Sequence, residues 1–150
     1  MDTSNPEQTG LYTPKELDYL KSQQLCRLAT ANAKGQPHIA PVGFRLNEDG
    51  TIDIAGHFGF SKRKKWRDAE QNPQVALVVD DIASYEPWVV RGIEIRGTVE
   101  LRMEGGESVI PGAGPEMFHI TPKRIISWGI EGNAYGPPHA RSVNEEENVG

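Results

Sequence analysis

Several features are scarce or absent in this sequence of 150 residues, and each absence excludes a class of protein. Cys26 is the only cysteine, which excludes an internal disulfide and a cysteine-based zinc site and suits a reducing cytoplasm. No apolar run approaches the length of a membrane span, and residues 1–10 have neither the charge nor the apolar core of a signal peptide. We therefore expect a cytoplasmic protein without a membrane segment.

Common catalytic motifs are also missing. No serine occupies a Gly-x-Ser-x-Gly turn, and Cys26 stands within an apolar segment, so nucleophilic catalysis is not supported. The spacing of Gly56 and Gly59 is not a dinucleotide-binding fingerprint. We expect no metal site, because the four histidines lack the spacing that a metal needs; they are His38, His57, His119 and His139.

Charge is unevenly distributed along the chain. The formal net charge is -5, yet positions 62–65 are four consecutive cations. A local basic cluster on an acidic chain indicates a small anionic ligand rather than nucleic acid, which needs a broad positive surface. With 37% hydrophobic and 25% charged residues, the chain has the composition of one soluble globular domain.

The basic cluster lies at the predicted start of a helix, with Ser61 as the N-cap. Cations at this end are disfavoured by the helix dipole, and a bound anion such as a phosphate would compensate for them. The alternative is a solvated basic face. Trp66 is expected to anchor the helix, so that Lys65 beside it is held in place, and His57 is the histidine expected near the ligand.

Before this helix, the pattern predicts one helix and three strands. Residues 11–21 form the helix, with Pro14 at its first position and a capping box between Thr13 and Glu16. The predicted strands cover 25–31, 36–46 and 51–55.

The second of these strands has an unusually bare face. Pro41 and Gly43 both weaken a strand interior. They are expected together where a flat ligand or another backbone comes close, or alternatively at a bulge or at the edge of a sheet.

The second half of the chain is predicted to be mostly strand. A buried strand over 74–79 ends at Asp80 and Asp81, which we expect to open a loop over 82–87 rather than to perform acid/base work. Residues 88–101 alternate over the longest stretch and predict a long, half-exposed, bent strand.

The remaining segments are shorter. Residues 103–116 lack periodicity and predict a surface loop that could serve as a lid, and 118–120 and 124–128 predict two short strands. Six or seven strands with hairpin-length connections and two helices indicate a mainly β fold, an antiparallel β-barrel with peripheral helices. The predicted parts are a flexible N-terminus, one domain and an extended, disordered acidic tail, at 1–10, 11–136 and 137–150.

Four stretches together resemble the pyridoxamine 5'-phosphate oxidase-like split β-barrel flavoproteins and their deazaflavin branch, which uses coenzyme F420. They are LATANAKGQPHIAPVGFRL, GTIDIAGH, SKRKKWRDAEQNPQVALVVDD and PWVVRGIEIRGTVEL, within about residues 16–130. The segments VALVVDD, RGIEIRG and ITPKRIISWGIEG are most similar to the F420-dependent branch of actinobacteria, which includes a reductase of tetracycline-type antibiotic biosynthesis.

The resemblance implies a homodimer with two cofactor sites between the subunits. It matches Lys65 to the phosphate-binding lysine of the family. The residues that it places around the same phosphate are Ser61, Lys62 and Lys64. Those along the ring system are Pro41, Val42 and Gly43, and those that approach from the partner subunit are Trp88, Arg91 and Gly92.

The implied cofactor is F420, with FMN as the alternative. FMN-dependent members carry Ser-Arg-Lys where this chain has Arg-Lys-Lys at 63–65. F420 carries a phosphodiester and a chain of glutamates, which four cations match better than they match one terminal phosphate.

The implied activity is reduction of a small molecule. Reduced F420 would pass a hydride to an activated alkene or a related electrophile, and His57, Arg91 or water would supply the proton. The alternatives are an FMN-dependent oxidase or reductase and a non-catalytic module that carries a cofactor or haem.

Overall fold

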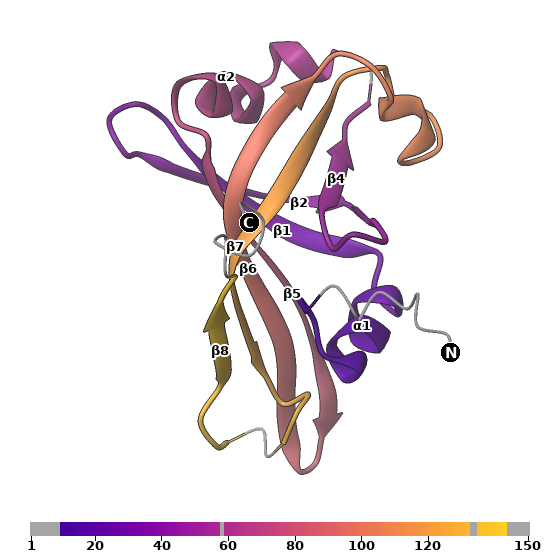
Figure 1. Ribbon diagram of the computed structural model, residues 1–150, viewed down its shortest axis with the longest axis vertical. Coiled ribbons are helices and arrows are strands. Elements are labelled where there is room, and N and C mark those ends of the chain that lie inside the picture. The colour runs from indigo at the N-terminus through magenta and orange to yellow at the C-terminus, as the bar shows by residue number, and fades with distance from the viewer. Residues whose placement is uncertain (1–9, 58, 133–134, 144–150) are drawn as a thin grey trace.

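One antiparallel sheet carries most of the fold (Figure 1). The computed structural model describes residues 10–57, 59–132 and 135–143. The elements are α1 (Pro14–Lys21), β1 (Leu25–Ala31), β2 (Pro37–Gly43), β3 (Arg45–Leu46), β4 (Ile52–Ala55), η2 (Phe60–Lys62), α2 (Lys64–Gln71), β5 (Gln74–Tyr85), β6 (Trp88–Arg102), η3 (Gly106–Ser108), β7 (Met117–Trp128) and β8 (His139–Ser142).

The strand order is β2-β1-β5-β6-β7-β4-β3, with β8 paired to β7. The sheet is not closed, but it curls so that the edge strand β2 comes close to β4 (Figure 1). This arrangement confirms the predicted antiparallel split barrel with peripheral helices. The short strands β3 and β8 bring the number of strands to eight.

The loop predicted over 82–87 was wrong, because β5 continues to Tyr85 and forms a hairpin with β6. Cross-strand ion pairs hold the two aspartates within the strand. Asp80 pairs with Arg27 at 2.6 Å, and Asp81 pairs with Arg91 at 2.8 Å. Charges that would end an isolated strand are therefore compatible with this one.

The two short strands predicted over 118–128 were also wrong, because β7 is one strand across that range. Pro122 lies opposite Gly97 at a shift in the β6–β7 register. A β-bulge tolerates a proline inside a sheet, and a Cβ on Gly97 would meet the Thr121 carbonyl oxygen at 2.3 Å. The long strand therefore bends without breaking.

Two further boundaries differ from the prediction. The strand predicted over 36–46 is interrupted at Phe44 and divides into β2 and β3. Residues 139–142, within the tail predicted to be extended and disordered, form β8, which agrees with the extended conformation but not with the disorder. The predicted flexible N-terminus and the acidic end of the tail lie outside the described residues, apart from Gly10.

The capping box of α1 is confirmed. Thr13 Oγ1 accepts a hydrogen bond from the Glu16 backbone N–H at 3.1 Å, and Glu16 Oε1 accepts one from the Thr13 backbone N–H at 3.0 Å. Glu16 is fully buried, and it also accepts hydrogen bonds from Ser127 and Arg141. One carboxylate thus joins α1 to β7 and β8.

Three aromatic rings dock α2 on the barrel. Trp66 is buried, and its ring centroid lies 5.4 Å from that of Phe60 and 5.6 Å from that of Phe118. This confirms Trp66 as the anchor of the helix, with Ala69 buried on the same side. Both α-helices have eight residues, and no helix in the described part of the chain is long and apolar enough to span a membrane.

Candidate functional site

A pocket of about 270 Å³ lies where β2, the end of β4 and the start of α2 come together. It contains five of the residues predicted to bind the cofactor, namely Pro41, Val42, Gly43, His57 and Lys65. The other lining residues were not predicted; they are Leu25, Ala55, Gly56, Phe60, Arg63 and Ile110. The pocket therefore joins the predicted bare strand to the predicted basic cluster.

Two cations, Arg63 and Lys65, form one wall of the pocket. The Lys65 ammonium lies 5.8 Å from the centroid of the Phe60 ring. Partial burial, together with the nearby Arg63 guanidinium, lowers the pKa of Lys65 below its usual value. No carboxylate in the described ranges pairs with either side chain, so both are available to an anion.

The start of α2 corrects the prediction that Ser61 is its N-cap. The helix begins at Lys64 and has Arg63 in the N-cap position, with no side-chain hydrogen bond to the cap. Ser61 lies in the preceding 3₁₀ turn, where its hydroxyl donates to Glu116 Oε2 at 3.0 Å. Only Lys64 and Lys65 of the four cations therefore lie within the first turn.

The other predicted phosphate ligands face elsewhere. Lys62 is exposed and outside the pocket lining, and Lys64 forms an i, i+4 ion pair with Asp68 at 3.0 Å. The structure places Arg63 in the pocket instead. Arg63 belongs to the basic run at 62–65, but the family resemblance placed Ser61, Lys62 and Lys64 around the phosphate and left Arg63 out.

The ring-binding face predicted on β2 is open in the single chain. Pro41 is exposed, and Gly43 pairs with Leu25, whose side chain is also exposed. The β1–β2 register runs without a shift from Leu25 to Ala31, so Pro41 and Gly43 do not mark a bulge. Because β2 is an edge strand, its position also explains the proline.

The 103–116 loop contributes Ile110 to the pocket. The Ile110 Cγ2 atom lies 3.4 Å from the position that a Cβ would take on Gly43, and Gly112 lies near the His57 ring. The Gly114 backbone N–H donates to the Gly56 carbonyl oxygen at 3.2 Å. The predicted surface loop therefore lies against the pocket, although nothing in its sequence pattern distinguished Ile110.

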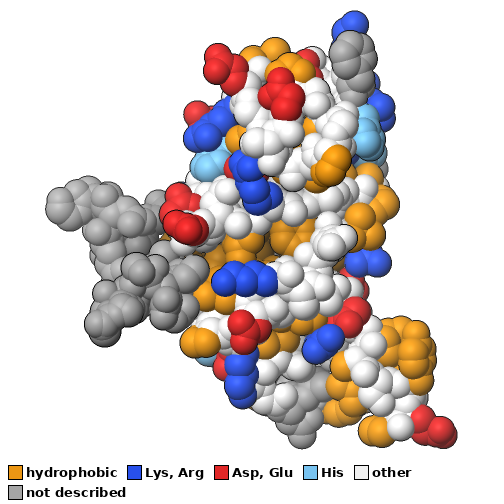
Figure 2. Space-filling view, turned by 90° about the vertical axis from the view of Figure 1, so that its right-hand side faces the viewer, with side chains coloured by type: hydrophobic (Ala, Val, Ile, Leu, Met, Phe, Trp, Pro, Cys, Tyr) orange, Lys and Arg blue, Asp and Glu red, His pale blue; other side chains and the backbone are white. Residues whose placement is uncertain are grey.

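The residues predicted to approach from the partner subunit do not line this pocket within one chain. Arg91 is bound to Asp81 and lies over the Tyr19 ring, 4.9 Å from its centroid, beside a separate groove of about 390 Å³. Gly92 packs against Trp128. Trp88 is 52% exposed at the end of the β5–β6 hairpin, where Figure 2 shows hydrophobic side chains gathered at the lower end of the molecule.

A larger hollow of about 630 Å³ lies over β1, β5, β6 and β7, and it contains none of the predicted site residues. Two cations line it: Arg96 is paired with Glu94, and Lys123 is not free either. We therefore assign the candidate site to the smaller pocket, whose cations are unpaired. Among the described residues, no group of three or more His, Cys, Asp or Glu side chains could hold a metal ion.

Sequence comparison finds related proteins over most of the chain. The family model described as pyridoxamine 5'-phosphate oxidase matches residues 12–128. A curated relative from Streptomyces rimosus, a 5a,11a-dehydrotetracycline/5a,11a-dehydrooxytetracycline reductase, is 42% identical over 137 residues, which are 91% of this chain and 96% of the relative.

Solved structures with low sequence identity share the fold. A heme-binding protein from Mycobacterium smegmatis has a TM-score of 0.67 at 15% identity, with 88% of this chain and 60% of that chain covered. A conserved hypothetical protein from Mycobacterium tuberculosis has a TM-score of 0.63 at 22% identity, with 89% of this chain and 93% of that chain covered. The heme storage protein HutZ from Vibrio cholerae has a TM-score of 0.56 at 16% identity, with 73% of this chain and 89% of that chain covered.

Proposed function

The chain belongs to the pyridoxamine 5'-phosphate oxidase family, and from this premise we propose that it is an oxidoreductase, specifically an F420-dependent reductase of a small unsaturated molecule. The observation that carries the proposal is the pair of cations, Arg63 and Lys65, at one side of a pocket bordered by the open strand of Pro41–Gly43. The reductase activity of the relative from Streptomyces rimosus supports the same reaction class.

The residues of the pocket fit an elongated anionic cofactor with a flat ring system. Arg63 and Lys65 would hold a phosphodiester, because each can form charge-assisted hydrogen bonds and neither has a carboxylate partner among the described residues. Lys62 is exposed nearby and could meet further negative charges of the polyglutamate tail. FMN ends in one phosphate and has no such tail, so it would make no contact of this kind with Lys62.

The flat ring would lie along Pro41, Val42 and Gly43. A strand without large side chains permits close contact with the backbone. The chemistry that the cofactor supplies when bound is hydride donation to an activated alkene or a related electrophile. The protein would bind and orient the reactants, and its apolar border of Leu25, Phe60 and Ile110 would exclude water.

Of the two side chains that could donate the proton, His57 borders the pocket, whereas Arg91 is paired with Asp81, which raises the pKa of its guanidinium further and makes it a poor acid. We assign the proton transfer to His57. Arg91, Trp88 and Gly92 would complete the site from the partner subunit of a homodimer. Their position on β6, away from the pocket of their own chain, is compatible with that role.

The proposal is tested by titrating the purified protein with F420, FMN and hemin in parallel. Trp66 packs directly against Phe60 of the pocket, so tryptophan fluorescence should report binding. We expect F420 to bind most tightly and the protein to purify colourless. A yellow protein with tightly held FMN would instead support the oxidase alternative, and a Soret shift with hemin but no response to F420 would support the haem-carrying alternative.

A further inference from the structure

The 103–116 loop supplies a part of the pocket wall that belongs neither to the sheet nor to the segment from Gly56 to the start of α2. Ile110 is the only residue of this loop, all of which is described, that lines the pocket. Its side chain is half-buried and touches the Gly43 end of β2. Ile110 therefore limits the space above the strand that we propose to carry the cofactor ring.

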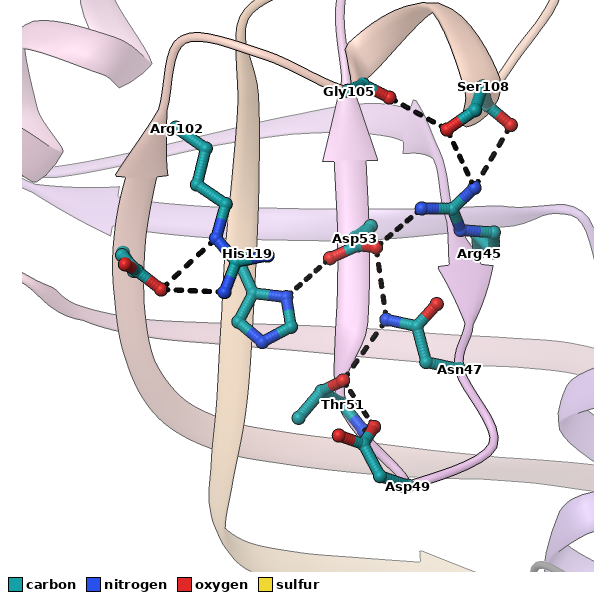
Figure 3. Close-up of polar contacts among 10 residues, drawn as sticks. Arg45, Asn47, Asp49, Thr51, Asp53, Arg102, Gly105, Ser108 and His119 are labelled. Carbon is teal, nitrogen blue, oxygen red and sulfur yellow. Dashed lines mark hydrogen bonds and ion pairs between the residues drawn. The ribbon is translucent and has the colours of Figure 1, made fainter.

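A guanidinium group fastens the loop two residues before Ile110 (Figure 3). Arg45 Nη1 donates to the carbonyl oxygen and to Oγ of Ser108, each at 3.0 Å. Its Nη2 donates to Asp53 Oδ2 at 2.7 Å. Arg45 thus connects the loop to a carboxylate on β4.

Asp53 is a fixed anchor for this bridge. It is 3% exposed, it accepts a hydrogen bond from Asn47 at 3.0 Å, and its Oδ1 lies 2.7 Å from His119 Nδ1 (Figure 3). Burial alone would raise the pKa of Asp53, but hydrogen bonds from Arg45, His119 and Asn47 hold it below its usual value. The carboxylate therefore stays charged and keeps Arg45 in place.

The other end of the loop is fastened to the connection between β4 and α2. The Gly114 backbone N–H donates to the Gly56 carbonyl oxygen, and Ser61 Oγ donates to Glu116 Oε2. The segment that carries Ile110 is therefore held from both ends across the pocket.

We propose that Ile110 is a specificity-determining residue of this pocket and that Arg45 is the positioning residue that holds it there. The apolar side chains of Ile110, Leu25 and Pro41 line the pocket, so the substrate that fits beside them is largely apolar, and the proposed function makes it an unsaturated electrophile. The part of this inference that concerns the ligand rests on the proposed function. The part that concerns Arg45 does not.

The first test uses thiol labelling, because Cys26 is fully buried and burial raises the pKa of its thiol to about 12. A cysteine placed at position 110 is then the reactive thiol of the protein. We expect Ile110→Cys to be protected from iodoacetamide by bound F420. Val109→Cys, on the same loop but outside the pocket lining, is the matched control and should not be protected.

Arg45→Met in the Ile110→Cys protein tests positioning without any ligand. It should raise the labelling rate by about tenfold, which corresponds to the loss of one charge-assisted hydrogen bond. Arg45→Lys keeps the charge and should give a labelling rate between those of the Arg45→Met protein and the protein with Arg45. Circular dichroism confirms that each variant is folded, and Arg45→Lys provides the test if Arg45→Met does not fold.

The second test measures kcat and KM with reduced F420 and two enones that differ in width. Ile110→Ala should shift the ratio of their kcat/KM values by about tenfold toward the wider enone, whereas Val109→Ala should not. The whole proposal is overturned if F420 protects position 110 no more than position 109 and if Arg45→Met and Arg45→Lys both leave the labelling rate at position 110 unchanged. If Arg45→Met accelerates labelling but F420 neither protects position 110 nor supports turnover, the proposed function and the specificity role fail, and the positioning role stands.

Discussion

The ammonium group of Lys65 lies 5.8 Å from the centroid of the Phe60 ring, and its charged neighbour is the Arg63 guanidinium rather than a carboxylate. The Phe60 ring is itself fixed against Trp66 and Phe118 in the core. Two like charges beside an apolar wall repel each other, and an anion bound between them would offset that repulsion. This relationship is the strongest structural argument for an anionic ligand.

Lys65→Glu should therefore weaken binding of F420 by about 100-fold, because it removes a charge-assisted hydrogen bond and adds repulsion. Lys34→Glu makes the same change of charge at an exposed residue of the turn between β1 and β2, outside the pocket lining, and should weaken binding less than about threefold. Fluorescence titration of both variants at the same salt concentration measures the difference. Equal losses in both variants would show a diffuse electrostatic effect and would contradict the assignment of Lys65.

Local signals in the sequence predicted the parts of the fold that local interactions decide. The capping box of Thr13 and Glu16 and the strand at 25–31 are present as predicted. The predicted boundaries are wrong where a contact with a residue far away in the sequence decides how an element begins or ends. Asp80 stays within a strand because Arg27, 53 residues away, pairs with it. Ser61 does not cap α2 because its hydroxyl is bound to Glu116, 55 residues away.

The residues of the candidate site also divide into those that a local sequence pattern predicts and those that depend on distant contacts. Pro41, Gly43 and Lys65 could be predicted, because a bare strand and a basic helix start are visible in the sequence. Ile110 could not be, since it enters the pocket only through the contacts that fasten its loop. Arg63 belongs to the same basic run, but the family resemblance placed Lys62 and Lys64 beside the phosphate instead. The placement of Trp88, Arg91 and Gly92 in the site stays a prediction, because it depends on a partner subunit.

The buried carboxylate of Glu16 predicts a pH-dependent contribution to stability. Burial alone would raise its pKa, but hydrogen bonds from Arg141, Ser127 and the Thr13 backbone lower it below the usual value. Because the folded-state pKa is depressed, the stabilisation is present above the unfolded-state pKa of about 4.3. It is lost as the pH falls through the lower, folded-state value.

Glu16→Gln should accordingly lower the free energy of unfolding by about 3 kcal/mol at pH 7, because it leaves the Arg141 guanidinium without its charged partner. The difference from the wild type should shrink as the pH falls from the unfolded-state pKa of about 4.3 through the lower folded-state pKa, because the unfolded chain takes up a proton before the folded carboxylate does. Urea unfolding at several pH values measures it. Glu100→Gln, which removes one partner of an exposed pair with Arg102, should change the stability by less than about 0.5 kcal/mol. A difference for Glu16→Gln that does not vary with pH would contradict the argument.

Assigning the proton transfer to His57 predicts a separation of binding from turnover. His57→Gln should lower kcat with reduced F420 and an enone by about 100-fold, the usual contribution of a general acid. The dissociation constant for F420 should change little, because Lys65 and Arg63 remain. His139→Gln, at an exposed position on β8, should change neither quantity. If kcat is unchanged in His57→Gln, the proton comes from water; if only affinity falls, His57 is a binding contact.

The most demanding prediction concerns Arg91, which should complete the site of the partner subunit. Arg91→Glu would place a carboxylate beside Asp81 and remove the proposed contact with the cofactor, so that the homodimer of this variant, like that of Lys65→Glu, should be nearly inactive. In a C2 dimer that mixes the two variants, one site would carry both defects and the other would carry neither.

Refolding equal amounts of the two variants together should therefore restore about a quarter of the wild-type activity, because about half of the dimers are mixed and each has one intact site. The sum of the two separate activities is the control for residual turnover. Circular dichroism of each parent confirms that Arg91→Glu still folds without its pairing to Asp81; if it does not, Arg91→Met provides the same test. If the mixture shows no more activity than this sum, while size-exclusion and mass measurements confirm mixed dimers, Arg91 and Lys65 act within the same chain or Arg91 has no part in the site.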